Sequence, residues 1–226
     1  MAALPNFTFD STAEEVATAL ADNIKDKNVL ITGTSLNGIG FEAARVIAKY
    51  ANLVIITGYN AERLKLSEDA IKQENPSANV RRLTLDLSSL AAYAPITAYA
   101  EAKAAAVLTA AEISRRSKGR ILGYSLHPGV IVTNIMDASA PVMQSIGILT
   151  PEGKPNLKDH KFKTIPQGAA TTIAAAFDPR IVSTPGAYLD DSVVANEKVA
   201  PHSADPAAAS AVWTATEELV GEKFEF

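Results

Sequence analysis

Cysteine is absent from the 226-residue chain, which excludes disulfides, thiolate nucleophiles and cysteine-ligated metal sites. A strongly basic surface for nucleic acid is also absent, because 21 lysines and arginines stand against 25 aspartates and glutamates. No apolar run approaches the ~20 residues that span a membrane, and no signal-peptide pattern is present. We therefore expect a cytoplasmic protein that binds neither nucleic acid nor membrane.

What the chain has is a large apolar content, 47% of its residues, which is enough to build a sizeable core. At this length the expectation is one domain over residues 1–226. Its expected partner is a small-molecule substrate, and a homo-oligomer is the one assembly that we consider.

Strand and helix patterns alternate through the first third of the chain. Runs of β-branched and aliphatic residues predict buried strands, and apolar residues spaced three and four apart predict helices. Such a β-α-β-α-β series favours a parallel sheet with helices on both faces, the Rossmann-like doubly wound class of α/β folds. The strands are expected at 29–32, 53–57 and 80–87, the helices at 41–50 and 61–73, and a capping-box pattern at 11–14 predicts a short helix before them.

Helix and strand signals continue in the second half, but one segment interrupts them. Residues 136–162 show no period and contain three prolines, so we interpret them as a lid-like loop. Four lysines in or next to this segment, Lys154, Lys158, Lys161 and Lys163, are interpreted as a solvated face. The other expected elements are helices at 97–117, from about 166, and from Asp205 to the capping Gly221, and strands at 121–126 and 186–189.

A glycine-rich turn follows the first predicted strand. Gly33 ends the strand, and Gly38 and Gly40 open the helix after a polar loop. Glycines allow the backbone to approach a pyrophosphate, while the amides and the positive dipole end of the helix hold its charge. The loop between Gly33 and Gly38 is longer than the G-x-G-x-x-G spacing allows. The turn therefore fits either a nucleotide site or a tight connection between strand and helix.

Tyr99 and Lys103 stand one helical turn apart, on one face of the long predicted helix. A phenol with an unperturbed pKa near ~10 carries protons poorly at neutral pH. A neighbouring ammonium stabilises the phenolate, which would make such a tyrosine a usable acid and base. The alternative is an ordinary surface pair of tyrosine and lysine.

Taken in order, these motifs resemble the short-chain dehydrogenase/reductase family, and most closely its retinol-dehydrogenase-like subgroup. The resemblance extends over most of the chain and includes Asp86-Leu87, Ser125 to Thr133 and Gly186 to Leu189. It implies a nicotinamide cofactor and oxidoreductase activity on a carbonyl or alcohol. By the same resemblance, Tyr99 is the general acid/base, and Lys103 supports it and holds the nicotinamide ribose.

The resemblance also assigns residues around the cofactor and the substrate, and it implies no metal. It places the adenine at Asp86, the nicotinamide at Ile131 and Thr133, and the substrate oxygen at Ser89. The turn residues that it implies as cofactor contacts are Gly33, Ser35, Gly38, Ile39 and Gly40.

The chain departs from the family between Asp86 and Tyr99. Two βα units, about 60 residues, are missing there, and the family's Asn-Ala-Gly motif is absent. We therefore expect a sheet with fewer strands, in which the first strand has lost a neighbour. Either the strand at 121–126 moves beside the strand at 29–32 to give a five-stranded sheet, or a partner chain covers the gap.

The cofactor type follows from the residues after the second strand. Residues 57–60 read Thr-Gly-Tyr-Asn, with no acid to bind the ribose of NAD, and Arg63 could meet the 2′-phosphate of NADP. We therefore expect an NADP-dependent oxidoreductase acting on a small carbonyl or alcohol, with NAD as the alternative cofactor. The competing interpretations are a non-catalytic, truncated relative that retains at most nucleotide binding, and a shortened product with no stable function.

Overall fold

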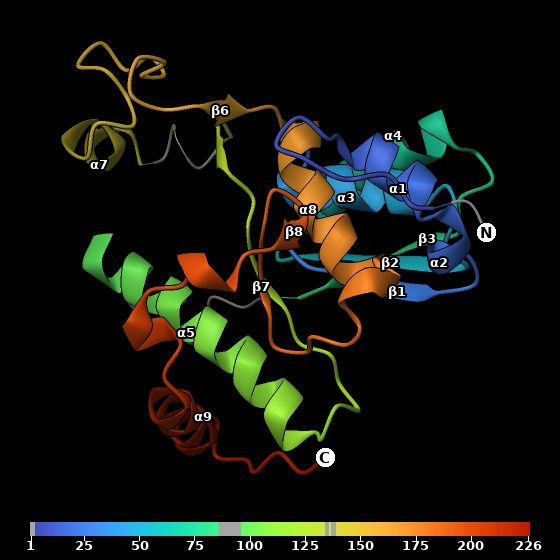
Figure 1. The fold of residues 1–226 in the computed structure, drawn as a ribbon. Coiled ribbons are helices and arrows are strands. Elements are labelled where there is room, and N and C mark those ends of the chain that lie inside the picture. Colours follow the sequence, from blue (N-terminus) through green and yellow to red (C-terminus); the bar gives the residue numbers. More distant parts are fainter. Residues whose placement is uncertain (1–2, 86–95, 134–135, 137–138) are drawn as a thin grey trace.

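Three short sheets and a helix that packs on both halves of the chain organise the molecule (Figure 1). The computed structural model describes residues 3–85, 96–133, 136 and 139–226, and of residues 96–99 it describes the backbone alone. Within the described residues, the first half of the chain forms one sheet and the second half forms the other two. The predicted α/β class, with a parallel sheet reduced in strand number, is confirmed.

The first sheet has three parallel strands, in register through Val29, Val54 and Val80. Val54, Ile56 and Val80 are buried because alternate side chains of a strand share one face, and this face lies against the helices. The five strands and helices predicted here are confirmed, with small shifts at their ends. They are β1 (Asn28–Ile31), α3 (Ile39–Ile47), β2 (Leu53–Gly58), α4 (Ala61–Glu74) and β3 (Val80–Thr84).

A capping box begins the helix before β1, one residue later than the sequence pattern indicated. Thr12 Oγ1 accepts a hydrogen bond from Glu15 N (3.3 Å), and Glu15 Oε2 accepts one from Thr12 N (2.8 Å). Ser11 is not the cap, because its Oγ accepts a hydrogen bond from Thr8 N (2.9 Å). The resulting helices are α1 (Ala13–Ala19) and α2 (Ala21–Ile24).

The second sheet joins β4 (Ser125–His127) in parallel to β7 (Tyr188–Asp190), which pairs antiparallel with β8 (Val193–Val194). Two helices of this half, α5 (Ile96–Arg116) and α9 (Pro206–Val220), pack on each other. The predicted caps of α9 are confirmed: Asp205 Oδ1 accepts a hydrogen bond from Ala207 N (2.9 Å), and Gly221 takes the left-handed conformation at φ 76°.

The strand predicted at 121–126 begins only at β4. Ser117 Oγ accepts a hydrogen bond from Ile121 N (3.1 Å), and Ser114 Oγ accepts one from Gly123 N (2.7 Å). These serines at and just after the end of α5 bind amide groups that a longer strand would use in its ladder. The prediction of a six-residue strand is therefore wrong.

In the described part of the chain the two sheets are separate, and β1 is not paired with β4. A groove of about 470 Å³ lies between them, with Leu30, Leu122 and Tyr124 in its walls. Leu30 is 54% exposed, because it points to the sheet face opposite the core, and Leu122 is 40% exposed. The predicted five-stranded sheet is wrong, since β4 pairs with β7 and the residues before β4 are bound to α5. A partner chain over the gap stays a prediction.

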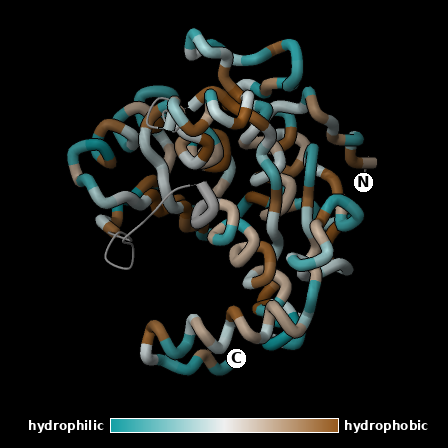
Figure 2. The backbone as a smooth tube through the Cα atoms, turned by 90° about the vertical axis from the view of Figure 1, so that its left-hand side faces the viewer, coloured by the Kyte–Doolittle hydropathy of each residue, from teal (hydrophilic) through white to brown (hydrophobic). Residues whose placement is uncertain are grey.

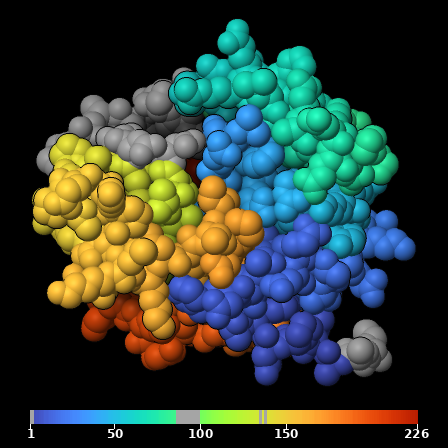
Figure 3. Space-filling view, turned by 90° about the horizontal axis from the view of Figure 1, so that it is seen from above, coloured from blue at the N-terminus to red at the C-terminus, as the bar shows by residue number. Residues whose placement is uncertain are grey.

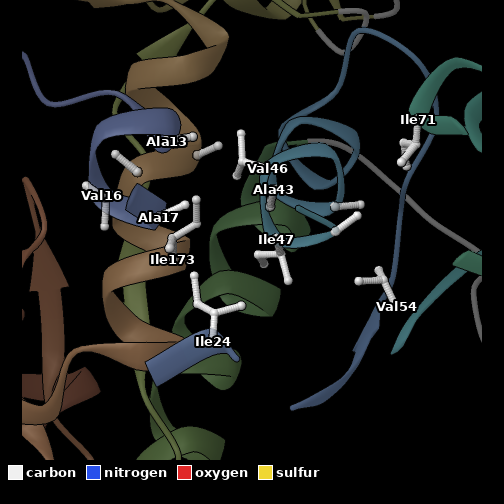
Figure 4. Packing of buried hydrophobic residues seen from close by; sticks show 14 of the residues in the cluster. Ala13, Val16, Ala17, Ile24, Ala43, Val46, Ile47, Val54, Ile71 and Ile173 are labelled. Carbon is white, nitrogen blue, oxygen red and sulfur yellow. The ribbon is translucent and has the colours of Figure 1, made fainter. Parts of the chain in front are cut away.

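Helix α8 (Ile165–Phe177) joins the two halves of the molecule. It packs on α1 and α3 and also contacts β4 and β7. In Figure 4, Ile173 of α8 lies beside Ala17 of α1, with Val46 of α3 next to them. Figure 3 shows α8 from above, in orange, between the blue N-terminal half and the yellow residues of the 139–162 region. Any ligand that touches both halves would therefore also lie near this helix.

The segment predicted as a lid contains regular structure. It includes α7 (Ala140–Ser145), and its end runs into β6 (Phe162–Lys163), which pairs with β5 (Val130–Ile131). Lys163 points inward, where its Nζ lies 2.6 Å from Asp191 Oδ1 and 4.8 Å from the centre of the Phe9 ring. The other three lysines of the predicted solvated face are exposed. The prediction is wrong for Lys163, because its pairing with β5 and with Asp191 holds it inside the protein.

The remaining helical elements are single turns. They are η2 (Pro179–Ile181), η3 (Asn196–Lys198) and η4 (Pro201–Ser203). Figure 2 shows hydrophilic and hydrophobic residues mixed along the helices. Among the residues that the structure describes, no helix is both long and apolar enough to cross a membrane.

Candidate functional site

The glycine-rich turn connects β1 to α3. Gly33 has a left-handed backbone (φ 69°), and a Cβ placed on it would meet no atom within 4 Å. A Cβ on Gly40 would lie 2.6 Å from Gly33 O, so the two backbones approach too closely for a larger residue. Gly38 is the N-cap of α3 and makes no side-chain hydrogen bond to the helix. The first amides of α3 therefore start the helix without a side-chain cap, which is the arrangement that suits an anionic ligand.

Two polar side chains hold the turn in place. Thr34 is buried, and both its N (3.3 Å) and its Oγ1 (3.1 Å) donate hydrogen bonds to Thr57 O at the end of β2. Ser67 Oγ of α4 donates to Thr34 O (2.7 Å). The sequence analysis missed both residues, although Ser67 lies between Leu64 and Ile71 on the inward face of its helix, which was a readable signal. The turn is thus fixed to the neighbouring strand and helix.

Two of the predicted catalytic residues, Tyr99 and Lys103, belong to α5. Tyr99 lies one turn before Lys103 along this helix, and its side chain lies outside the described residues. Asp86 and Ser89 also lie outside them. The roles of these three residues therefore stay predictions.

Lys103 lines a cavity of about 670 Å³. The carboxyl end of β4, at His127 and Pro128, forms a second part of the wall, and residues from β7 and from the η3–η4 region form a third. Ligands of open α/β sheets bind beyond the carboxyl ends of strands, so this position suits a substrate. The sequence analysis missed the third part, because nothing in residues 196–203 indicates a contact with a helix about a hundred residues earlier. Its polar residues are Tyr188, Lys198, His202 and Ser203.

Polar and ionic contacts set the protonation of this third part of the wall. Lys198 Nζ donates a hydrogen bond to Asp190 Oδ2 (2.5 Å), and this contact raises the pKa of Lys198. Burial raises the pKa of the Tyr188 phenol, and the nearby Asp190 carboxylate raises it further. At neutral pH the cavity wall therefore offers an ammonium and a protonated phenol.

The predicted nicotinamide contacts lie at the start of the 130s. Ile131 belongs to β5 and is 7% exposed, because it packs against Gly168 of α8. Its side chain is thus occupied by the protein, and its backbone is the part that a cofactor would meet. Thr133 is half-buried, and its carbonyl accepts a hydrogen bond from Met136 N (2.9 Å).

No acid follows the second strand in the structure either. Tyr59 is 66% exposed, and Asn60 is the N-cap of α4, where its Oδ1 accepts a hydrogen bond from Arg63 N (2.9 Å). The exposed Arg63 side chain lies in the first turn of the same helix. Glu62 lies beside Arg63 in this turn, so the absence of an acid applies to residues 57–60, directly at the end of β2.

Comparison with known proteins agrees with this architecture. No family model matches the chain. It is 32% identical over 132 residues to a Streptomyces antibioticus protein named "Probable oxidoreductase", an alignment that covers 54% of this chain and 44% of that protein. It is 30% identical over 141 residues to human retinol dehydrogenase 14, covering 60% of this chain and 39% of that one. The chain is also similar to proteins named short-chain dehydrogenase, from Brassica napus and Penicillium roqueforti.

The chain spans less than half the length of the Streptomyces antibioticus protein and of human retinol dehydrogenase 14. Its fold is similar to a solved structure from Mycobacterium paratuberculosis, with a TM-score of 0.60 at 15% identity over 91% of this chain and 98% of the other. It is also similar to L-sorbose reductase from Gluconobacter frateurii, with a TM-score of 0.53 at 13% identity over 74% and 95%. At such low identities these neighbours support the fold alone, and they confirm the predicted Rossmann-like class.

Proposed function

We propose that the protein is an NADP-dependent oxidoreductase that interconverts a small carbonyl compound and its alcohol. The observation that carries the proposal is the start of α3, which has no side-chain cap and faces the open, left-handed Gly33. A nicotinamide cofactor fits here because a Cβ at Gly40 would collide with the turn, while the space over Gly33 is free. The names of the relatives, oxidoreductase and retinol dehydrogenase, support the reaction class.

In this proposal the turn holds the pyrophosphate through backbone amides. The contacts come from Gly33, Ser35, Gly38, Ile39 and Gly40, and Asp86 would meet the adenine. We assign NADP rather than NAD because Arg63 stands near the end of β2 and no carboxylate lies in residues 57–60. The Gluconobacter reductase was solved with NADPH, which supports the same choice.

The bound cofactor would supply or accept the hydride. Tyr99 then donates the proton to the carbonyl oxygen during reduction and takes it back during oxidation. Lys103 stabilises the phenolate that remains and binds the nicotinamide ribose. Ser89 orients the same oxygen, and Ile131 and Thr133 meet the nicotinamide end.

A second candidate is a non-catalytic relative that keeps only nucleotide binding. Two observations favour it: the chain spans less than half of its relatives, and its sheets are separate within the described residues. Both candidates share one domain over residues 1–226, because α8 packs on both halves. We also keep the cytoplasmic location and the homo-oligomer as proposals.

Two measurements on the purified chain separate the candidates. Titration with NADPH, followed by nicotinamide fluorescence, tests binding, and nicotinamide absorbance with a panel of aldehydes and ketones tests turnover. Gly38→Val should weaken NADPH binding at least tenfold (about 1.4 kcal/mol), because a Cβ there would lie 3.1 Å from Ser35 O. Unchanged binding in a folded Gly38→Val protein would remove the site assignment.

A further inference from the structure

We propose that the cavity beside Lys103 is a subsite for an anionic group of the substrate, a carboxylate or a phosphate. The inference deepens the proposed function and depends on it for the identity of the ligand as a substrate. Residues 196–203, the η3–η4 region, form the part of the wall that recognises this anionic group.

The charge of the cavity wall is the first observation. Its ionisable residues of basic type are Lys103, His127, Lys198 and His202, and no aspartate or glutamate is among the described lining residues. Lys198 is paired with Asp190, and Asp191 and Glu197 lie near the same ammonium, so the wall offers N–H donors rather than an excess of positive charge. A wall of N–H donors, with no carboxylate among its described lining residues, suits the oxygen atoms of an anionic group.

The geometry of Lys198 is the second observation. Its ammonium donates one hydrogen bond to Asp190 Oδ2 (2.5 Å), and the Asp190 side chain is 14% exposed. This contact fixes the lysine above the end of β7, and an ammonium has three N–H donors. The two N–H groups that this contact does not use can donate to a ligand in the cavity.

The hydroxyl groups of the wall are the third observation. Ser125 Oγ, at the start of β4, is buried and has no hydrogen-bond partner among the described residues. Buried hydroxyls without partners are uncommon in folded proteins. Tyr188 adds a phenol that stays protonated at neutral pH. Both hydroxyls can donate to a carboxylate or phosphate oxygen.

The position of the wall separates this site from the cofactor turn. The described lining residues come from α5, the end of β4, β7 and residues 198–203, and none comes from residues 33–40 or 139–162. The anion that the cavity takes is therefore the substrate's and not the pyrophosphate of the cofactor. Substrate choice is then set by residues 196–203 rather than by the segment that the sequence suggested as a lid.

Proton NMR of the histidines tests the site without any turnover. The chain has three histidines, of which His127 and His202 line the cavity and His160 does not. On titration with a formylbenzoate, and separately with inorganic phosphate, the imidazole C–H signals of His127 and His202 should move and that of His160 should stay. The neutral methyl ester of the formylbenzoate should move none of them. Equal shifts at all three histidines, or none, would overturn the proposal.

The source of the anion is settled by adding cofactor. With the protein saturated by NADPH, the shifts caused by the formylbenzoate should persist, because in our proposal the cofactor meets this cavity only through its ribose at Lys103. Loss of these shifts through competition would assign the cavity to a phosphate of the cofactor and would overturn the proposal.

Kinetics with Lys198→Gln test the recognising wall. For the formylbenzoate, kcat/KM relative to its methyl ester should fall about tenfold, and the ratio for glyceraldehyde phosphate over glyceraldehyde should fall likewise. Lys65→Gln is the matched control, because Lys65 makes an equally short exposed pair with Asp69 (2.5 Å) on α4. It should leave both ratios unchanged, and equal effects of the two variants would contradict the assignment. If no carbonyl is reduced but the histidine signals respond as expected, the proposed function fails and the anion site stands.

Discussion

Gly168 lies in α8 at a point where a larger residue would meet the strand beside it. A Cβ at this position would lie 2.0 Å from Ile131 Cδ1 and 3.2 Å from Pro128 O. Overpacking a core contact costs about 1–3 kcal/mol, whereas exchanging glycine for alanine inside a helix stabilises it by about 0.5–1 kcal/mol. The clash is the larger effect, so Gly168→Ala should lower the free energy of unfolding by about 1–2 kcal/mol.

Ile131→Val is the matched second variant, because valine lacks the Cδ1 atom that the added methyl group would meet. Alone, it should cost about 0.5–1.5 kcal/mol of unfolding free energy. The double variant relieves the clash, so its stability should lie near that of Ile131→Val, and the coupling between the two positions should reach about 1–2 kcal/mol.

Urea titrations followed by circular dichroism give the three free energies by linear extrapolation. Purely additive effects of the two changes would refute the close approach of α8 to β5. They would also remove the reason for assigning the Ile131 side chain to helix packing rather than to the cofactor.

Four further outcomes are expected. Tyr99→Phe should abolish turnover and leave NADPH affinity unchanged, and a normal kcat would rule out the proton-transfer role. Asp191→Asn should lower the free energy of unfolding, measured in urea, by about 3 kcal/mol, because the buried Lys163 ammonium loses its partner. Lys163→Met should lower it by less, because it removes the buried charge. A larger loss for Lys163→Met than for Asp191→Asn would contradict the pairing. A hydrogen bond from the Lys223 ammonium (2.9 Å) lowers the pKa of Glu217 to about 2, below its ordinary value of 4.5. The ionised Glu217 carboxylate therefore stabilises the fold above pH 4.5, and this stabilisation is lost as the pH falls toward 2. Glu217→Gln should make the free energy of unfolding less dependent on pH between these values. An unaltered pH dependence would contradict the assigned pKa. Residues 136–162 should exchange amide hydrogens fastest without ligand, and strong protection there would argue against a lid.

The first half of the fold was predictable because its signals are local. Apolar period and turn residues identify β1, β2 and the intervening helix within a few residues. The turn at Gly33 and Gly38 was predictable for the same reason, since glycine marks a backbone that a side chain would obstruct.

The second half was less predictable because distant contacts decide it. Residues 121–124 read as strand, yet Ser114 and Ser117 bind their amides to the end of α5. Lys163 reads as a solvated residue, yet a partner 28 positions later holds it inside. The cavity wall at 196–203 has no local signature at all, because its meaning depends on where α5 lies.

The open edge of β1 limits how the protein can associate with other chains. Lys27 O accepts a hydrogen bond from Leu53 N (3.3 Å), so by alternation the backbone groups of Asn28 and Leu30 face away from β2. Long, apolar edge strands recruit other chains into fibrous aggregates, and natural proteins restrain them with short strands and charged or polar ends. This edge is four residues long and starts at Asn28, directly after Lys27. Within the described residues this edge is thus a short and polar-ended template, which disfavours uncontrolled growth of the sheet.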